Sequence, residues 1–405
     1  MYPTKCSGSL PGLTALVTML CFLTLSPIGH AQQSTSDNSA NTLQIGLSGT
    51  FTMGGSSVHN EEIQSLQAGG HDPNKNGFTV QNIELSLSGT VDPWFDAQAN
   101  IILLIDAEGE SVIELEEAFV TTRQLPGGLQ IKAGQYFTEF GRRNVQHPHQ
   151  WRFVDQPVIL SRLFGGDGLR SQGVRLSWLM PVNWYSEWLF GIQNASGETA
   201  ASFLSVVDED IGGYTLIDRQ ARNFSDLLYS ARWLNGMDIN DSLSLNLGIS
   251  ALEGPNASGE HTETRIHGAD IYLKWQPAQN QKGFPFVAWH TEYLRREYEA
   301  LDHFNPLHDT LKDKGFFSQL IWGFKPGWTT GLRWERADGN TSEPFDTLRN
   351  DRKRWSANIT WYPGEYSKLR LQYNRDNAHH LVDEPAHSLW LQLEFNLGSH
   401  MAHTF

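Results

Sequence analysis

Residues 388–405, SLWLQLEFNLGSHMAHTF, alternate between two kinds of side chain. From position 389 to position 397 every second residue is Leu or Phe, whereas the residues between them are mostly polar. A period of two predicts a β-strand with one apolar face and one polar face. We expect this strand to cover 387–405 and therefore to end on an aromatic residue, Phe405.

The same alternation recurs along the chain, for example in IELSLSGTV (83–91) and RWSANITW (354–361). The pattern predicts sixteen strands, an even number, as in single-chain bacterial barrels. Their expected ranges are 42–51, 78–91, 95–106, 112–123, 129–137, 173–180, 184–193, 224–234, 242–253, 264–275, 284–297, 315–324, 328–336, 353–362, 366–374 and 387–405. The predicted fold is all-β: a transmembrane antiparallel β-barrel over 42–405, closed by pairing of the last strand with the first.

The connections between these strands alternate in length. Short turns such as DPW, LPGG, KPG and PGE follow the even strands, and longer loops follow most odd strands, with 107–111 as an exception. Many of the 14 tryptophans lie close to the short turns, as expected of an aromatic girdle at a membrane surface. A secreted β-sandwich or solenoid would give no reason for this alternation. We therefore predict short periplasmic turns and long extracellular loops.

The N-terminal residues predict export. Lys5 precedes a short apolar run, and GHA at 29–31 ends in small residues, so 1–31 is interpreted as a signal peptide cleaved after Ala31. Residues 32–41 form a polar leader. Both cysteines of the chain, Cys6 and Cys21, lie in the signal peptide, so the mature protein would contain no thiol. The expected location is the outer membrane of a Gram-negative bacterium.

Composition excludes two other classes of protein. The chain has 45 acidic and 30 basic residues and a net charge of −15, which argues against general nucleic-acid binding. Its mean hydropathy is −0.40, and no mature segment reaches 18 consecutive apolar residues, which excludes a helical membrane protein. This hydropathy criterion does not exclude a membrane β-barrel, because about half of the residues in its strands are polar.

Two stretches, GFTVQNIELSLSGTVDPWFDA (77–97) and LPGGLQIKAGQYFTEFGRRN (125–144), resemble sixteen-stranded outer-membrane porins, most closely the phosphate-selective porin O and P group. The resemblance covers 42–405 in pattern and architecture. It implies a homotrimer in outer-membrane lipid, with a water-filled channel for small hydrophilic solutes and a third loop folded inward. Phe405 also resembles the C-terminal signal that the barrel-assembly machinery reads.

The longest connection, 138–172, is the candidate inward constriction loop. Its arginines, together with two basic residues predicted on the lumen face, would favour anions in the pore. The alternative is that the arginines pair with lumen carboxylates and only anchor the loop. The candidate selectivity residues are Arg142, Arg143, Arg152, Arg162, Arg170, Arg175 and Lys132.

Metal binding is a weaker hypothesis. The candidates are His147 and His149 in the sequence HPH, and His379 and His380 in the last long loop. Neither spacing is diagnostic of a metal site, so no cofactor is predicted. The stretch DPNKNG (72–77) matches only the first half of a calcium loop, and a plain turn explains it better.

No catalytic motif is present: the chain lacks G-x-S-x-G, HExxH and a mature cysteine nucleophile. The sequence therefore predicts a non-enzymatic porin, a passive diffusion channel with a possible bias toward anions such as phosphate. Two alternatives stay open. One is an uptake receptor for a metal ion or chelate, related to zinc, and the other is a structural barrel with a closed lumen.

Overall fold

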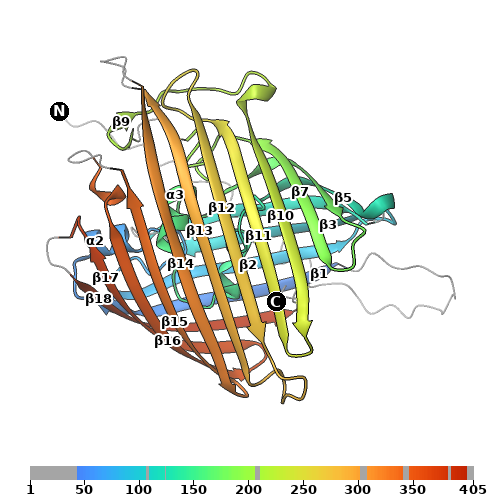
Figure 1. Cartoon of the computed structure of the whole chain (residues 1–405). Coiled ribbons are helices and arrows are strands. Elements are labelled where there is room, and N and C mark those ends of the chain that lie inside the picture. Colours follow the sequence, from blue (N-terminus) through green and yellow to red (C-terminus); the bar gives the residue numbers. More distant parts are fainter. Residues whose placement is uncertain are drawn as a thin grey trace, which may run out of the picture. The chain divides into compact units, whose positions relative to one another are not determined.

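The structure, a computed structural model, describes residues 43–105, 109–123, 125–205, 210–301, 308–340, 346–381 and 385–398. The described residues form a closed antiparallel barrel of sixteen strands, which confirms the predicted fold (Figure 1). The predicted signal peptide (1–31), the polar leader (32–41) and Phe405 lie outside the described residues.

The chain closes on itself because β1 pairs with β18, Gly46 lying opposite Gly398. The barrel strands are β1 (Gln44–Ser56), β2 (Gly77–Thr90), β3 (Phe95–Ile105), β4 (Ser111–Thr122), β5 (Leu129–Phe137), β6 (Arg170–Leu179), β7 (Tyr185–Asn194), β10 (Leu227–Asn240), β11 (Leu243–Pro255), β12 (Glu263–Trp275), β13 (Phe286–Leu301), β14 (His308–Lys325), β15 (Trp328–Gly339), β16 (Arg352–Gly364), β17 (Ser367–Ala378) and β18 (Ala386–Gly398).

Shorter elements lie in the connections. They are α2 (Asn60–Leu66), α3 (Val158–Phe164), the hairpin strands β8 (Asp210–Ile211) and β9 (Tyr214–Thr215), and the 3-10 turns η1 (Pro126–Gly128), η2 (Pro148–Gln150), η3 (Phe224–Asp226) and η4 (Thr347–Arg349). Among the described residues, no helix is long and apolar enough to cross a membrane. Below, "loop end" means the barrel end that carries the long connections, and "turn end" means the opposite end.

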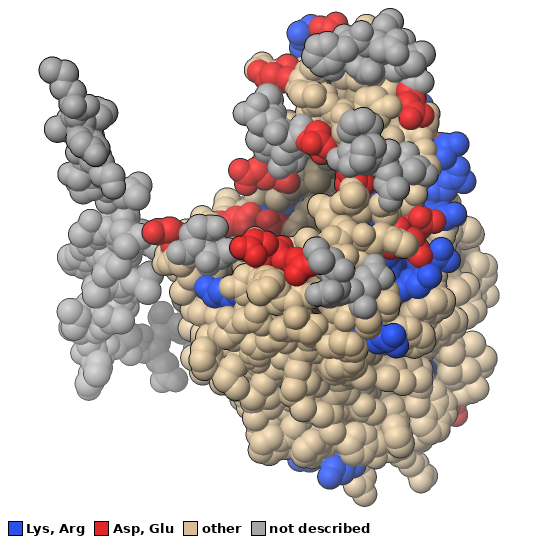
Figure 2. Space-filling model, turned by 90° about the vertical axis from the view of Figure 1, so that its left-hand side faces the viewer, with Lys and Arg blue, Asp and Glu red and all other residues tan. Residues whose placement is uncertain are grey.

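The barrel is apolar outside and polar inside. Along β18, Leu389, Leu391 and Leu393 are exposed, whereas the intervening Gln392 and Glu394 are buried. This is the reverse of a water-soluble sheet and is the arrangement of a barrel in lipid. On the outer face that Figure 2 shows, a broad band almost free of charged residues lies below the charged loop end.

Tryptophans gather near the turn end, as the sequence predicts. The rings of Trp188 and Trp233 on neighbouring strands stack with centroids 5.3 Å apart, and those of Trp328 and Trp361 stack at 6.0 Å. Such rings prefer the boundary between lipid and water. They therefore mark one edge of the apolar band.

All sixteen predicted strands are present, but several extend further than predicted at the loop end. The strand predicted over 315–324 begins at His308, and the one predicted over 284–297 continues to Leu301. The backbones of these two strands stay paired as far as Leu301 and His308. Side chains still alternate between the two faces here, but the outward positions carry polar residues such as Glu299 and Lys312 instead of apolar ones, so the pattern of apolar and polar residues did not reveal these extensions. The last strand is described as far as Gly398.

β4 departs from strict alternation at one position. Asn100 of β3 pairs with Glu117, and the next residue of β3, Ile101, pairs with Leu115. Glu116 is therefore the additional residue of a β-bulge. The bulge allows Glu116 and Glu117 to be buried in the lumen together, although a regular strand would turn one of them toward lipid.

Candidate functional site

Residues 138–169, which connect β5 to β6, lie inside the barrel and are called the inward segment. Several of its backbone N–H groups donate to inward-facing side chains. Those of Arg142 and Arg143 donate to Glu292 Oε1 of β13 at 2.8 and 2.7 Å, and that of Val154 donates to Gln372 Oε1 of β17 at 2.8 Å. The barrel wall thus replaces the water that an exposed loop would bind.

The carbonyl groups of the inward segment are bound in the same way. Lys368 Nζ donates to the carbonyl oxygen of His149 at 2.9 Å, and Arg370 Nη2 donates to that of Trp151 at 2.8 Å. The donors belong to β17, so this wall holds the segment through its backbone, whatever side chains the segment carries.

Asp155 is the strongest electrostatic anchor of the inward segment. Its carboxylate forms ion pairs with Arg333 and with Arg354, the latter at 3.4 Å, and accepts hydrogen bonds from Gln372 at 3.0 Å and Asn374 at 2.8 Å. Burial alone would raise the pKa of Asp155, but the guanidinium groups of Arg354 and Arg333 hold it below its ordinary value. Gln67 Nε2 donates a further hydrogen bond to Oδ2 at 3.3 Å, so Asp155 is a buried anion that five side chains stabilise.

α3 anchors the next part of the inward segment by apolar packing. Its residues Val158, Ile159, Leu160, Leu163 and Phe164 are all buried, in a cluster that also contains side chains of the barrel wall. A side chain at position 315 of β14 would collide with α3, because a Cβ there would lie 2.8 Å from the Cδ1 atom of Ile159. Gly315 therefore allows the helix to approach the wall closely.

Cavities lie on both sides of the inward segment. One of about 530 Å³ opens at the loop end. Two others, of about 250 and 340 Å³, are lined by residues near the turn end. A smaller space of about 20 Å³ shares Gln156 with the loop-end cavity and Gln146 and Trp151 with a turn-end cavity. The two ends of the lumen thus approach each other at a narrow place beside the inward segment.

Two of the candidate arginines, Arg142 and Arg152, line the turn-end cavity of about 250 Å³ together with Lys368. The guanidinium of Arg142 lies over the Tyr272 ring, 4.0 Å from its centroid. Lys368 pairs with Glu394 at 2.6 Å. We call this space the arginine cavity.

Arg143 lies at the narrow place rather than in the arginine cavity. Its guanidinium lies 4.1 Å from the centroid of the Trp151 ring and donates to Gln146 Oε1 at 3.3 Å. Burial and the nearby positive charge of Arg333 lower the pKa of Arg143 to about 9. It is the one candidate arginine that lines the smallest of the described cavities.

The remaining basic candidates bind protein groups. Arg162 donates to the carbonyl oxygens of residues 348–350 at the loop end. Arg170 pairs with Glu114. Lys132 and Arg175 share the carboxylate of Glu139, at 3.2 and 3.3 Å. The structure thus brings together Lys132 and Arg175 but places Arg162 far from them along the lumen, against different walls and cavities.

The four candidate histidines separate into two pairs. His379 is exposed, and His380 lies beside Ser65, its Nε2 atom 3.0 Å from the hydroxyl oxygen. Burial and the charge of Arg352 lower the pKa of His380 to about 4. His147 and His149, in contrast, lie in the lumen with their rings stacked 5.7 Å apart.

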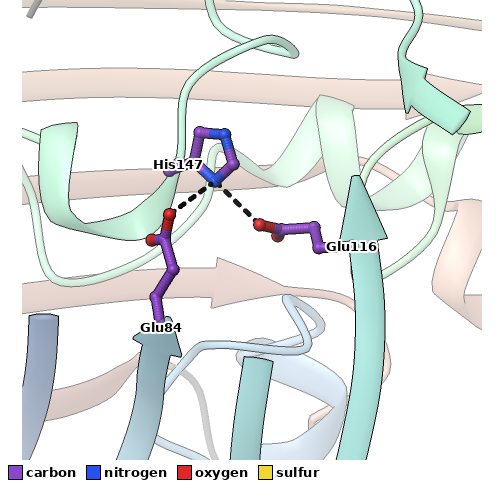
Figure 3. A group of neighbouring side chains, drawn as sticks. All are labelled: Glu84, Glu116 and His147. Carbon is purple, nitrogen blue, oxygen red and sulfur yellow. Dashed lines mark ion pairs between the residues drawn. The ribbon is translucent and has the colours of Figure 1, made fainter. Parts of the chain in front are cut away.

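His147 enters a group of carboxylates on β2 and β4 (Figure 3). Its Nδ1 atom lies 2.7 Å from Glu116 Oε2 and 3.5 Å from Glu84 Oε1, and its Nε2 atom lies 3.0 Å from Glu117 Oε2. His149 Nδ1 lies 2.8 Å from Glu84 Oε2. We call these five residues the carboxylate–histidine cluster.

The sequence pattern indicated the histidines of this cluster but not its glutamates. One observation could have located two of them. Glu116 and Glu117 are adjacent in a strand of a lipid-embedded barrel, where a regular alternation would turn one charge into the membrane. Such a pair in a predicted strand indicates a bulge and hence a local site.

No protein-family model matches the chain. A protein of Aquifex aeolicus, described only as uncharacterized, is 30% identical over 412 residues, which cover 93% of this chain and 83% of that protein. The chain belongs to the same family as this Aquifex aeolicus protein.

Solved structures share the barrel. The outer-membrane channel DcaP of Acinetobacter baumannii aligns with a TM-score of 0.56 and 9% identity over 88% of this chain and 96% of its own. An anion-selective porin from Comamonas acidovorans aligns at 0.54 and 9% over 88% and 100%. The trimer form of Vibrio cholerae OmpT, an outer-membrane protein, aligns at 0.52 and 7% over 89% and 100%. At these identities the likeness concerns the fold.

Proposed function

We propose that this protein is an outer-membrane porin, a passive channel for small hydrophilic solutes, with its turn end in the periplasm and its loop end outside the cell. The observation that carries the proposal is the pair of polar spaces on either side of the inward segment, within a barrel that is apolar outside. Solutes would be selected by the width of the narrow place and by the charges around it, without bond chemistry.

We further propose a bias toward small anions such as phosphate. The arginine cavity is lined by three basic residues, Arg142, Arg152 and Lys368, and by two acidic ones, Glu365 and Glu394. Because Lys368 and Glu394 form a pair, Arg142 and Arg152 leave the cavity with an excess of positive charge. Arg143 places a further cation at the narrow place.

The proposal includes assembly as a homotrimer after insertion by the barrel-assembly machinery. Support comes from the apolar outer face and from the trimer form of a protein with the same fold. Chemical cross-linking of the detergent-solubilised protein would test it, a ladder that ends at three copies being the expected result.

Single-channel recording of the refolded mature protein in a planar bilayer tests the channel and its bias. We expect stepwise conductance and a chloride-favouring reversal potential in a potassium chloride gradient. The double variant Arg142→Gln with Arg152→Gln should move the potential toward potassium. Arg295→Gln is the matched control, because Arg295 is exposed and pairs with Glu297 outside the lumen.

The possible results separate the parts of the proposal. A potassium-favouring wild type, or a double variant that leaves the potential unchanged, would refute the anion bias and keep the porin. Protein that is demonstrably folded and inserted but never conducts would refute the porin and favour a structural barrel with a closed lumen.

A further inference from the structure

The carboxylate–histidine cluster brings three buried carboxylates together, and no Lys or Arg among the described residues forms an ion pair with them. Glu84, Glu116 and Glu117 are all buried. In the part of the chain that the structure describes, their ion pairs are made only with histidines, chiefly His147 and His149. A third ring, that of His71, lies 3.8 Å from Glu116, so the three carboxylates depend on imidazoles alone for their ion pairs, and a buried carboxylate without a cation beside it is costly.

The donor atoms also converge. One ligand atom each from Glu84, Glu116 and His147 lies within 4.8 Å of the other two. Glu116 Oε2 is buried and accepts no hydrogen bond, although His147 Nδ1 is only 2.7 Å away. The two atoms are therefore close together without the alignment that a hydrogen bond requires.

We propose that Glu84, Glu116 and His147 bind a divalent transition-metal cation in the lumen, with Zn²⁺ as the representative ion. His147 Nδ1 lies 2.7 Å from Glu116 Oε2 and 3.5 Å from Glu84 Oε1, so adjustment of these side chains could place all three donors about 2.0–2.2 Å from one ion. An imidazole nitrogen with carboxylate oxygens suits Zn²⁺ and similar ions, whereas Ca²⁺ and Mg²⁺ prefer oxygen ligands alone.

The surroundings of His147 match those of a metal-binding histidine. Its Nε2 atom lies 3.0 Å from Glu117 Oε2, so an Nε2–H that donates to Glu117 leaves Nδ1, the ring atom nearest to Glu116 and Glu84, without a hydrogen and able to bind a cation. Carboxylates commonly orient metal-binding imidazoles in this way. Asn100 Nδ2 donates to Glu84 Oε1 at 3.1 Å and orients a second ligand.

The bound cation would link three parts of the chain: β2 through Glu84, β4 through its bulge at Glu116, and the inward segment through His147. Asp155 holds the same segment to β15 and β16 through Arg333 and Arg354. The metal would thus complete a second attachment of the inward segment, on another part of the barrel wall.

Metal titration of the full mature protein in detergent tests the proposal. After treatment with EDTA, isothermal titration calorimetry with zinc sulfate should give one site per chain, and calcium chloride should bind at least tenfold more weakly. Glu116→Gln and His147→Gln should each weaken zinc binding at least tenfold. His290→Gln is the matched control, because His290 is a buried lumen histidine with a single carboxylate partner, Glu292, at 2.9 Å; it should bind zinc like the wild type.

X-ray absorption of the zinc-loaded wild type gives a readout that does not depend on how any variant folds. It should show only nitrogen and oxygen ligands at about 2.0–2.2 Å. Absence of zinc binding, equal binding by the folded variants, or calcium binding as tight as zinc binding would overturn the proposal. Conductance of the wild type in EDTA separates this result from the porin proposal, because it is measured without metal.

Discussion

Asp155 Oδ2 of the inward segment lies 3.4 Å from Arg354 Nη1 of β16, and both side chains are almost completely buried. A charge pair removed from water in this way adds little net stability, but loss of one partner leaves the other charge uncompensated. The pair therefore fixes where the inward segment can lie in the lumen.

Asp155→Asn should loosen the inward segment. The change leaves Arg333 and Arg354 with less negative charge beside them, at a cost of about 3 kcal/mol or more. We expect larger and noisier single-channel currents and a lower denaturation midpoint. Asp351→Asn, which breaks the more exposed pairs with Arg336 and Lys353, should cost about 1 kcal/mol or less. Equal behaviour of the two variants would argue against Asp155 as an anchor.

The selectivity of the channel should depend on pH near neutrality. Burial and the nearby charge of Asp155 raise the pKa of Asp72 to about 7, against the opposing effect of Arg354. Asp72 lines the loop-end cavity, and it loses its negative charge as pH falls from 8 to 6. The reversal potential should therefore become more chloride-favouring over this range. Asp72→Asn, with no charge at either pH, should show a smaller change.

The same group has a defined effect on stability. Its pKa is higher in the folded protein than the value of about 3.9 for an unfolded aspartate, so its contribution to the free energy of unfolding is greatest below about pH 4, decreases as pH rises and is lost above about 7. Between pH 6 and 8 the denaturation midpoint of the wild type should fall relative to that of Asp72→Asn. Parallel curves for the two proteins would contradict the raised pKa.

Charge on the outer face should be tolerated according to depth. Leu391 lies near the middle of β18 on the exposed apolar face, so Leu391→Arg should cost about 2–4 kcal/mol in a bilayer. Leu397, next to the end of β18, should tolerate the same change at about 0–1 kcal/mol. Unfolding of the two variants in lipid vesicles would measure the difference. Equal costs would mean that the membrane band has been misplaced.

Deletion of Glu116 should remove the metal site and keep the barrel. Because Glu116 is the additional residue of the bulge, its removal leaves Leu115 outside and Glu117 inside in a regular strand. We expect normal heat-modifiable migration on a gel and loss of zinc binding. Deletion of Val120, which lies in the regular part of β4, should reverse the facing of its neighbours and prevent folding.

The sequence predicted the strands because side-chain alternation is a local property that lipid outside and water inside impose on each strand separately. It also indicated His147 and His149, because both lie in the predicted inward loop. It could not join His147 to Glu116, because that contact depends on the path of the inward segment and on a bulge that breaks the alternation. Asp155 of the inward segment and Arg354 of β16 are also far apart in the sequence, so their contact could not be predicted either.

Two charged residues outside the carboxylate–histidine cluster also have partners that the sequence could not predict. Arg162 and Arg170 lie in or beside the same long connection, yet one binds carbonyl oxygens at residues 348–350 and the other binds Glu114. In the sequence both arginines were candidate selectivity residues of the same loop. The partners differ because successive parts of the inward segment contact different strands of the barrel wall. These contacts are defined only once the barrel has closed.

Pairing of β1 with β18 also sets the order in which the molecule can be completed. Until the final strand is in place, the growing sheet has two open edges, each able to bind strands of other chains. Arg333 and Arg354, which hold Asp155, belong to strands near the end of the chain. The inward segment can therefore reach its final position only after nearly all strands have been added to the sheet, and until then water binds its polar backbone. The first half of the chain cannot complete the barrel by itself. We therefore expect assembly to need a chaperone that keeps the early strands from pairing with other chains.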